Sequence, residues 1–256
     1  MKQFKGLLKK DWTIVKGYVF LALLLNLLIP VGASAVLQIG WFEGILSFSA
    51  AMMGLHAIMP LVLLAILLSK DMERPDIFFH SGASIHLLNG AKLVVAIGST
   101  LISFVFATLI ALVSLLFAPG QAGIPEVLAS GALYMLNIFL FSLIIVIVFY
   151  FFATVFYLIK PKIGAFAYIV TFGLFFIAID LWTRFQGTAF YSRISDFWVV
   201  TIAEGDGLQV EKSAGSIEFS IDSASTLAVG DWLIHFVLLA VLYFLASYWF
   251  DRKVRD

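Results

Sequence analysis

Most polar side chains in the apolar runs of this sequence are hydroxyls, and amide and imidazole groups are few. Asn26, His56 and Asn137 each lie inside a long apolar run. Polar residues in such segments usually face other protein rather than lipid. We therefore predict that each of them either lines a polar path or gate for a substrate, or makes an interhelical hydrogen bond.

Two charged pairs have the four-residue spacing that places both side chains on one face of a helix. Asp180 and Arg184 form the first pair, and Asp231 and His235 form the second. One interpretation is a polar gate, or a proton-sensitive pair where histidine takes part. The other is an interfacial ion pair, with Asp231 as an acidic residue near a helix N-terminus. We favour the second interpretation.

No motif for catalysis or nucleotide binding occurs in the chain. It has no G-x-x-x-x-G-K-[ST] phosphate loop, no H-E-x-x-H zinc motif and no G-x-S-x-G nucleophile turn. The four histidines are scattered, and the lack of cysteine excludes disulfides, thiolate catalysis and iron–sulfur sites. We expect no catalytic residue, no metal ligand and no cofactor on this chain, and we predict that it is not an enzyme.

The composition is that of a polytopic membrane protein. The chain is 62% hydrophobic and 12% charged, whereas a soluble domain is about 25% charged. A helix needs about 20 apolar residues to cross the hydrocarbon of a bilayer. We predict an all-α fold with one transmembrane domain over residues 1–256, in which Pro30 and Pro60 kink the first two spans. The six expected spans are residues 17–39, 45–69, 91–118, 127–158, 163–186 and 230–250.

Basic residues set the expected orientation of a membrane protein. All but three of the 16 Lys and Arg residues lie in the N-terminal segment, in alternate connections or in the C-terminal tail. The exceptions are Arg184, Arg193 and Lys212. Both termini of this multi-pass chain are therefore predicted to be cytoplasmic, and segment 187–229 to be extracellular.

Two segments outside the spans have patterns of their own. Apolar residues recur at helical spacing among lysines in residues 1–16, which predicts an amphipathic helix on the cytoplasmic membrane surface. Within segment 187–229, "LQVEKSAGSIEFSI" alternates polar and apolar residues around Ser213, Ala214 and Gly215, which predicts a small β-hairpin. This segment is too short for an independent enzyme domain, so we expect it to cap the bundle.

The connection at residues 70–90 is predicted to contain a short cytoplasmic helix. Pro75 and Asp76 suit the first turn of a helix. Ser81–Gly82 offers a stop, and Ser84 can cap a new helix that continues into the third span.

Three consecutive large apolar residues, Ile77, Phe78 and Phe79, lie inside this charged connection. One short helix cannot direct all three into its own bundle, and together they would form an exposed apolar patch. We therefore expect another surface to cover this patch. The alternatives are lipid headgroups, the protein's own helix ends, or a groove on a soluble partner.

This arrangement resembles the permease subunits of ABC-type exporters. The likeness rests on the N-terminal surface helix, the six spans, and the short cytoplasmic helix between spans two and three. After that helix, a break of small residues at Ser81–Ile85 leads to Gly90–Lys92. Specifically, the chain resembles the half-size, six-helix class of bacterial peptide and antimicrobial exporters, such as the phenol-soluble-modulin type.

The resemblance implies a mechanism. In this class two permease subunits pair, and two cytoplasmic ATPase subunits dock beneath them and hold ATP and Mg. The short helix would be the coupling helix that the ATPases move. In this chain it would comprise Arg74, Pro75, Asp76, Ile77, Phe78, Phe79 and His80.

The resemblance also implies the partners and the location. The partners would be ATP-binding-cassette ATPase subunits, a second permease copy or a paralogue, and membrane lipid, with no nucleic acid. The location would be a bacterial plasma membrane. The near absence of charge in the spans suits an apolar or amphipathic substrate, such as a peptide or an antimicrobial compound.

Other functions fit parts of the sequence. One is export of a lipid, and another is a sensor or scaffold that resembles a permease but transports nothing. A secondary transporter would need a charged coupling site in mid-membrane, and the central portions of the predicted spans contain almost no charge.

Overall fold

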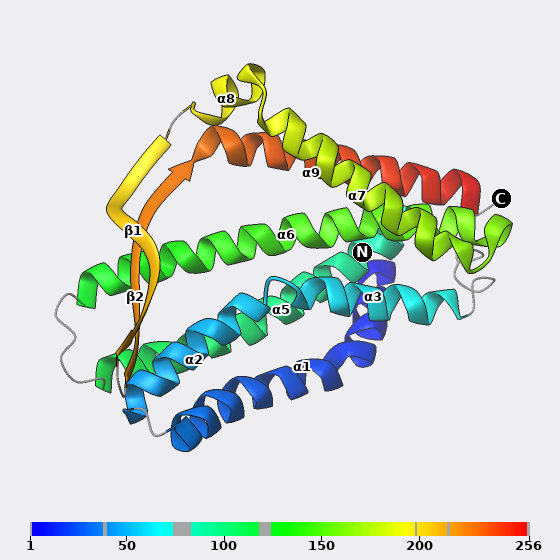
Figure 1. The fold of residues 1–256 in the computed structure, drawn as a ribbon. Helices are drawn as coiled ribbons and strands as arrows, with labels where there is room; N and C mark the ends of the chain where they lie inside the picture. Colours follow the sequence, from blue (N-terminus) through cyan, green and yellow to red (C-terminus); the bar gives the residue numbers. More distant parts are fainter. Residues whose placement is uncertain are drawn as a thin grey trace.

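The computed structural model describes residues 2–37, 40–73, 83–117, 124–197, 199–213 and 216–254. Long helices lie side by side, and a pair of strands lies at one end of the molecule (Figure 1). The elements are α1 (Lys2–Leu37), α2 (Trp41–Leu55), α3 (Met59–Met72), α5 (Ile85–Phe117), α6 (Ile124–Ile163), α7 (Phe166–Gln186), α8 (Ala189–Ser195), β1 (Val199–Ser213), β2 (Ser216–Ala228), α9 (Val229–Trp249) and a π-helix, η1 (Phe250–Val254).

Five of these helices are long and apolar enough to cross a membrane: α1, α5, α6, α7 and α9. α2 and α3 pass the same test only as a pair, bent by 43° at the break between them. Within its described ranges the chain therefore has five candidate spans, or six if the bent pair counts as one. The helical, polytopic membrane architecture that the composition predicted is confirmed at this level.

The predicted second span, residues 45–69, is not one kinked helix. α2 ends at Leu55, and the backbone N–H groups of His56, Ala57 and Ile58 donate to carbonyls three residues earlier. Pro60 lies in the first turn of α3, where its missing N–H leaves no hydrogen bond unmade. The structure has a break here in place of the expected kink.

The predicted surface segment 1–16 is the first part of α1, which continues without interruption into the predicted first span. The first turns of α1, dark blue in Figure 1, run at an angle to the rest of the helix. Leu7, Leu8 and Val15 belong to or pack against the buried clusters of the protein. Part of the apolar face of this segment thus packs on the bundle, and Trp12, on the same segment, is 40% exposed.

Consecutive connections alternate between the two ends of the bundle. Both termini, the end of α3 and the α6–α7 turn lie toward the right in Figure 1, and the α1–α2 reversal lies at the left. The α6–α7 reversal is made at Gly164, whose φ of +58° is a left-handed conformation that favours glycine. The connections that carry most of the basic residues therefore lie at one end of the bundle, as the predicted topology requires.

β1 and β2 form a two-stranded antiparallel sheet in the segment where the sequence predicted a hairpin. The pairing runs from Val199 opposite Ala228 to Ser213 opposite Ser216, with register shifts between Thr201 and Asp206. Both strands extend beyond the alternating stretch, and β2 leads directly into α9.

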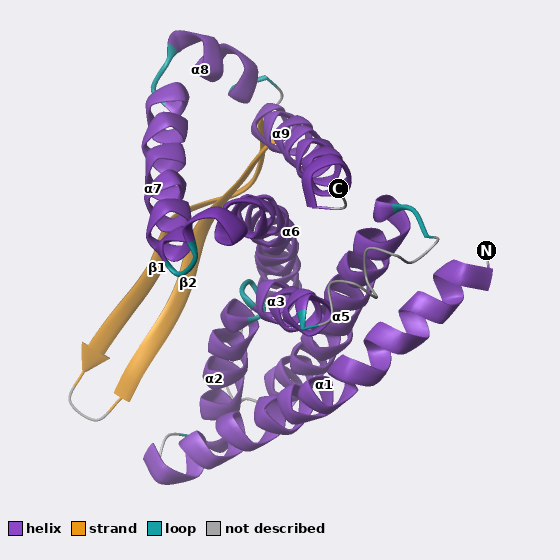
Figure 2. Cartoon of the chain, turned by 90° about the vertical axis from the view of Figure 1, so that its right-hand side faces the viewer, coloured by secondary structure: helices purple, strands orange, loops and turns teal. Residues whose placement is uncertain are grey.

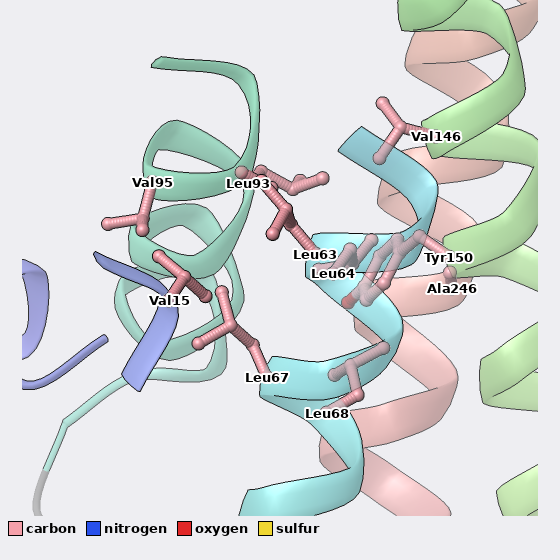
Figure 3. Packing of buried hydrophobic residues seen from close by; sticks show 11 residues of the cluster. Val15, Leu63, Leu64, Leu67, Leu68, Leu93, Val95, Val146, Tyr150 and Ala246 are labelled. Atoms are coloured by element: carbon pink, nitrogen blue, oxygen red, sulfur yellow. The ribbon is translucent and has the colours of Figure 1, made fainter. Parts of the chain in front are cut away.

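The main core lies around α3. Leu63, Leu64, Leu67 and Leu68 cover a broad face of this short helix and are almost fully buried. They meet side chains of α1, α5, α6 and α9, as Figure 3 shows. Because several helices contact α3, its last turn is held in a fixed place within the bundle.

Candidate functional site

The predicted coupling residues, Arg74 to His80, lie in segment 74–82, outside the described residues. The structure shows both flanks of that segment. α3 ends at Met72 on one side. On the other, Ser84 Oγ accepts a long hydrogen bond from the backbone N–H of Leu87, at 3.4 Å. The predicted cap of α5 is thus confirmed.

A group of four charged residues, three of them with largely buried side chains, joins α1 to both flanks of this segment. Lys92 Nζ, from α5, lies 2.5 Å from Oδ2 of Asp71, in the last turn of α3. Lys10 Nζ, from α1, lies 2.7 Å from Oδ1 of the same aspartate. Asp11, also on α1, lies 3.9 Å from Lys92 and 3.6 Å from Lys10. We call Lys10, Asp11, Asp71 and Lys92 the charge cluster.

The charge cluster is removed from solvent to an unusual degree. The side chains of Lys92 and Asp11 are 0% and 1% exposed, that of Asp71 is 10% exposed, and only Lys10 is open, at 45%. Two lysines and two aspartates sum to zero formal charge. Burial of an unpaired charge is strongly unfavourable, so charges at such depth need mutual partners. The cluster therefore ties α1, α3 and α5 together at this end of the bundle.

Sequence reasoning missed the charge cluster. It used Lys92 and Lys10 as markers of topology and gave no role to Asp11 or Asp71. One signal was present: Lys92 lies just inside the predicted third span, where a lysine needs an acidic partner. The sequence did not show which acidic residue that was.

A second polar network lies deeper in the bundle. Asn26 Nδ2, from α1, donates to Ser103 Oγ of α5 at 3.0 Å and to the Ser103 carbonyl oxygen at 3.2 Å. His56 Nε2 lies 3.0 Å from Ser103 Oγ and 3.4 Å from Asn26 Nδ2. All three residues are buried. The structure thus joins two of the predicted polar residues through a serine that sequence reasoning did not single out.

The direction of these hydrogen bonds follows from His56. Its Nδ1 lies 2.9 Å from the carbonyl oxygen of Met52, and a carbonyl can only accept. We therefore assign the ring proton to Nδ1, so the neutral ring presents Nε2 as an acceptor to the Ser103 hydroxyl. The interhelical hydrogen bonds predicted for Asn26 and His56 are confirmed, and they fasten the α2–α3 break to α1 and α5.

A third network links α5, α6 and α9. Asn89 Nδ2 donates to the hydroxyl of Tyr150 at 2.8 Å, and that hydroxyl lies 3.2 Å from Ser247 Oγ. Tyr150 is fully buried and is one of the core residues in Figure 3. Asn89 is one helical turn before Lys92, so α5 carries this network and the charge cluster close together.

The remaining predicted path residues lie elsewhere. Asn137 is exposed on α6. Asp180 and Arg184 are exposed on α7 and form an ion pair, with Nε 2.8 Å from Oδ2. The ion-pair interpretation of this spacing is confirmed. Of the five predicted path residues, the structure therefore brings Asn26 to His56 and Asp180 to Arg184 as two separate pairs.

The Asp231–His235 pair has a third member, Tyr191, from α8. The Tyr191 hydroxyl donates to Asp231 Oδ1, and His235 Nδ1 donates to the Asp231 carbonyl oxygen at 2.8 Å. Burial and the hydrogen bond to Asp231 raise the pKa of Tyr191 above its ordinary value. A Cβ atom on Gly230 would collide with the Ile194 carbonyl oxygen, so α8 packs closely on the start of α9.

Comparison of the chain with models of known protein families, with curated proteins and with solved structures finds no match. The class of protein is therefore defined by the chain itself: a polytopic helical membrane protein.

Proposed function

We propose that this chain is the permease subunit of an ATP-driven ABC-type exporter in a bacterial plasma membrane, and that segment 74–80 docks on a separate cytoplasmic ATPase. The charge cluster is the observation that carries the proposal. It holds the two helices that flank the segment to each other and to α1. A displacement of segment 74–80 would therefore move three helices together.

The proposed substrate is an apolar or amphipathic molecule, such as a peptide or an antimicrobial compound, that leaves the cytoplasm or the inner leaflet. The deep network of Asn26, His56 and Ser103 supports this class, because it is built from amide, imidazole and hydroxyl groups and contains no carboxylate or lysine. The exposed side chains of α7 are largely apolar, which suits contact with lipid or with a second permease copy.

Purification of the tagged full-length chain from its native membrane should recover a soluble ATPase. Hydrolysis by that complex should rise when an amphipathic peptide is added. A control variant in which residues 74–80 are replaced by glycine and serine should recover little ATPase. Recovery of no ATPase by the wild-type chain would contradict the proposal. A rate of ATP hydrolysis that is unchanged by added peptides and by added lipids would favour a sensor or scaffold.

The proposed orientation can be tested with cysteine labelling, because the chain has no cysteine of its own. Ser213→Cys should react with a membrane-impermeant thiol reagent in whole cells, because segment 187–229 is expected outside. Ser81→Cys should react only after the cells are permeabilised. The reverse pattern would overturn the orientation and the proposed docking side.

A further inference from the structure

The charge cluster is unevenly paired. Both lysines lie close to Asp71, at 2.5 and 2.7 Å, whereas Asp11 lies 3.9 and 3.6 Å from them. Nitrogen–oxygen distances above about 3.5 Å are too long for a hydrogen bond. Neither oxygen of Asp11 has a hydrogen-bond donor in the described part of the chain, whereas Asp71 Oδ1 accepts from Lys10 and only its Oδ2 has no bond of good geometry, despite the 2.5 Å contact with Lys92. A fully buried carboxylate without a donor is an unfavourable arrangement.

The cluster has enough donors for both carboxylates, because each ammonium group carries three N–H bonds. In the structure both lysines are directed at Asp71. Lys92 Nζ would need to move only about 1 Å nearer to Asp11, from 3.9 Å to the roughly 2.8 Å of a charge-assisted hydrogen bond. We propose that the charge cluster is a two-position switch, in which Lys92 pairs with Asp71 in one arrangement and with Asp11 in the other.

The second arrangement leaves no carboxylate without a cation. Lys10 lies 2.7 Å from Asp71 and stays with it when Lys92 moves to Asp11. Each aspartate then has one lysine, and no proton or ion has to enter or leave the buried site. Two discrete pairings of the same charges are the kind of element on which conformational switching depends.

The exchange changes which helices are fastened together. Lys92 is on α5, Asp71 is on α3 and Asp11 is on α1. The present arrangement ties α5 directly to α3, and the second ties α5 to α1 and frees the end of α3 to move against α5. Because α3 and α5 flank segment 74–82, the exchange would change how the two flanks are held to each other, a consequence that rests on the proposed function.

The switch can be tested on the full chain alone, in lipid nanodiscs without an ATPase. Spin labels at Glu73→Cys after α3 and Val94→Cys on α5 would occupy exposed positions, and electron paramagnetic resonance would give the distance between these two helices, which the exchange changes. Asp71→Asn should move most of the protein to a second label distance, because Lys92 then pairs with Asp11. Asp11→Asn should leave a single population at the main wild-type distance.

Asp180→Asn is the matched control, because it removes a carboxylate from an exposed ion pair and should leave the distances unchanged. Equal distances in all variants would overturn the switch. A similar broadening in Asp71→Asn and Asp11→Asn would also overturn it, since that result indicates general loosening.

If Asp71→Asn does not yield a monodisperse protein, the Asp11→Asn variant decides the question. A minor wild-type population that Asp11→Asn removes supports the switch, and a single population that it leaves unchanged overturns it. Because no ATPase takes part, this result is independent of whether the chain belongs to an exporter.

Discussion

Replacement of Lys92 by methionine should lower the free energy of unfolding by about 3–5 kcal/mol, because it removes one partner from a buried ion pair. Methionine keeps much of the side-chain volume but leaves Asp11 and Asp71 with Lys10 as the remaining cation of the charge cluster. Thermal unfolding of the purified chain in detergent measures the effect.

Lys70→Met is the matched control. Lys70 pairs with Glu73 on the exposed end of α3, and exposed ion pairs are worth about 0–1 kcal/mol. Joint replacement of Asp11 and Asp71 by leucine and of Lys92 by methionine should recover most of the lost stability, because no buried charge is then left unpaired. If the Lys92→Met chain unfolds at the wild-type temperature, the Lys92–Asp71 ion pair does not stabilise the fold as expected.

Phe78→Ala combined with Phe79→Ala should weaken binding of the proposed ATPase on the order of a hundredfold or more. A few buried aromatic residues usually carry most of the energy of a protein interface. The variant should still insert and fold, because the substituted residues lie outside the candidate spans. A pull-down from detergent at equal permease abundance gives the comparison with wild type.

Arg74→Ala and Asp76→Ala serve as controls in the same segment. Their effects should be smaller, because an ion pair that stays hydrated contributes about 0–1 kcal/mol. Undiminished ATPase recovery by the double phenylalanine variant, with normal substrate-stimulated hydrolysis, would place these side chains on lipid or on their own bundle. The coupling assignment would then be wrong even if the chain is an exporter subunit.

The membrane-crossing helices could be predicted because the signal is local: about 20 consecutive apolar residues can span the hydrocarbon. The runs at 91–118 and 127–158 fall largely within α5 and α6. The break inside 45–69 could not be predicted in the same way. Proline fits both a kink within a helix and the first turn of a helix. At Pro60 the structure has the second of these, next to a break where His56 contacts other helices.

The candidate site was less predictable because its contacts join distant parts of the chain. Asp11 lies among lysines, a pattern that indicates a solvated helix face, yet it is buried because α1 packs on α3 and α5. Ser103 has no feature in the sequence that separates it from other serines in the spans. Sequence pattern gave the polar candidates Asn26 and His56, and packing decided that they are neighbours.

The length of α6 has a practical consequence for imaging. Its 40 residues, at 1.5 Å each, make a rod about 60 Å long. Even a tilt of 40° leaves about 46 Å along the membrane normal, which exceeds the hydrocarbon thickness of about 30 Å. Strand β2 contacts α6, and both strands lie at one end of the molecule (Figures 1 and 2). In cryo-electron microscopy, an antibody fragment raised against these strands would stand clear of the detergent micelle and give small particles a feature by which to be aligned.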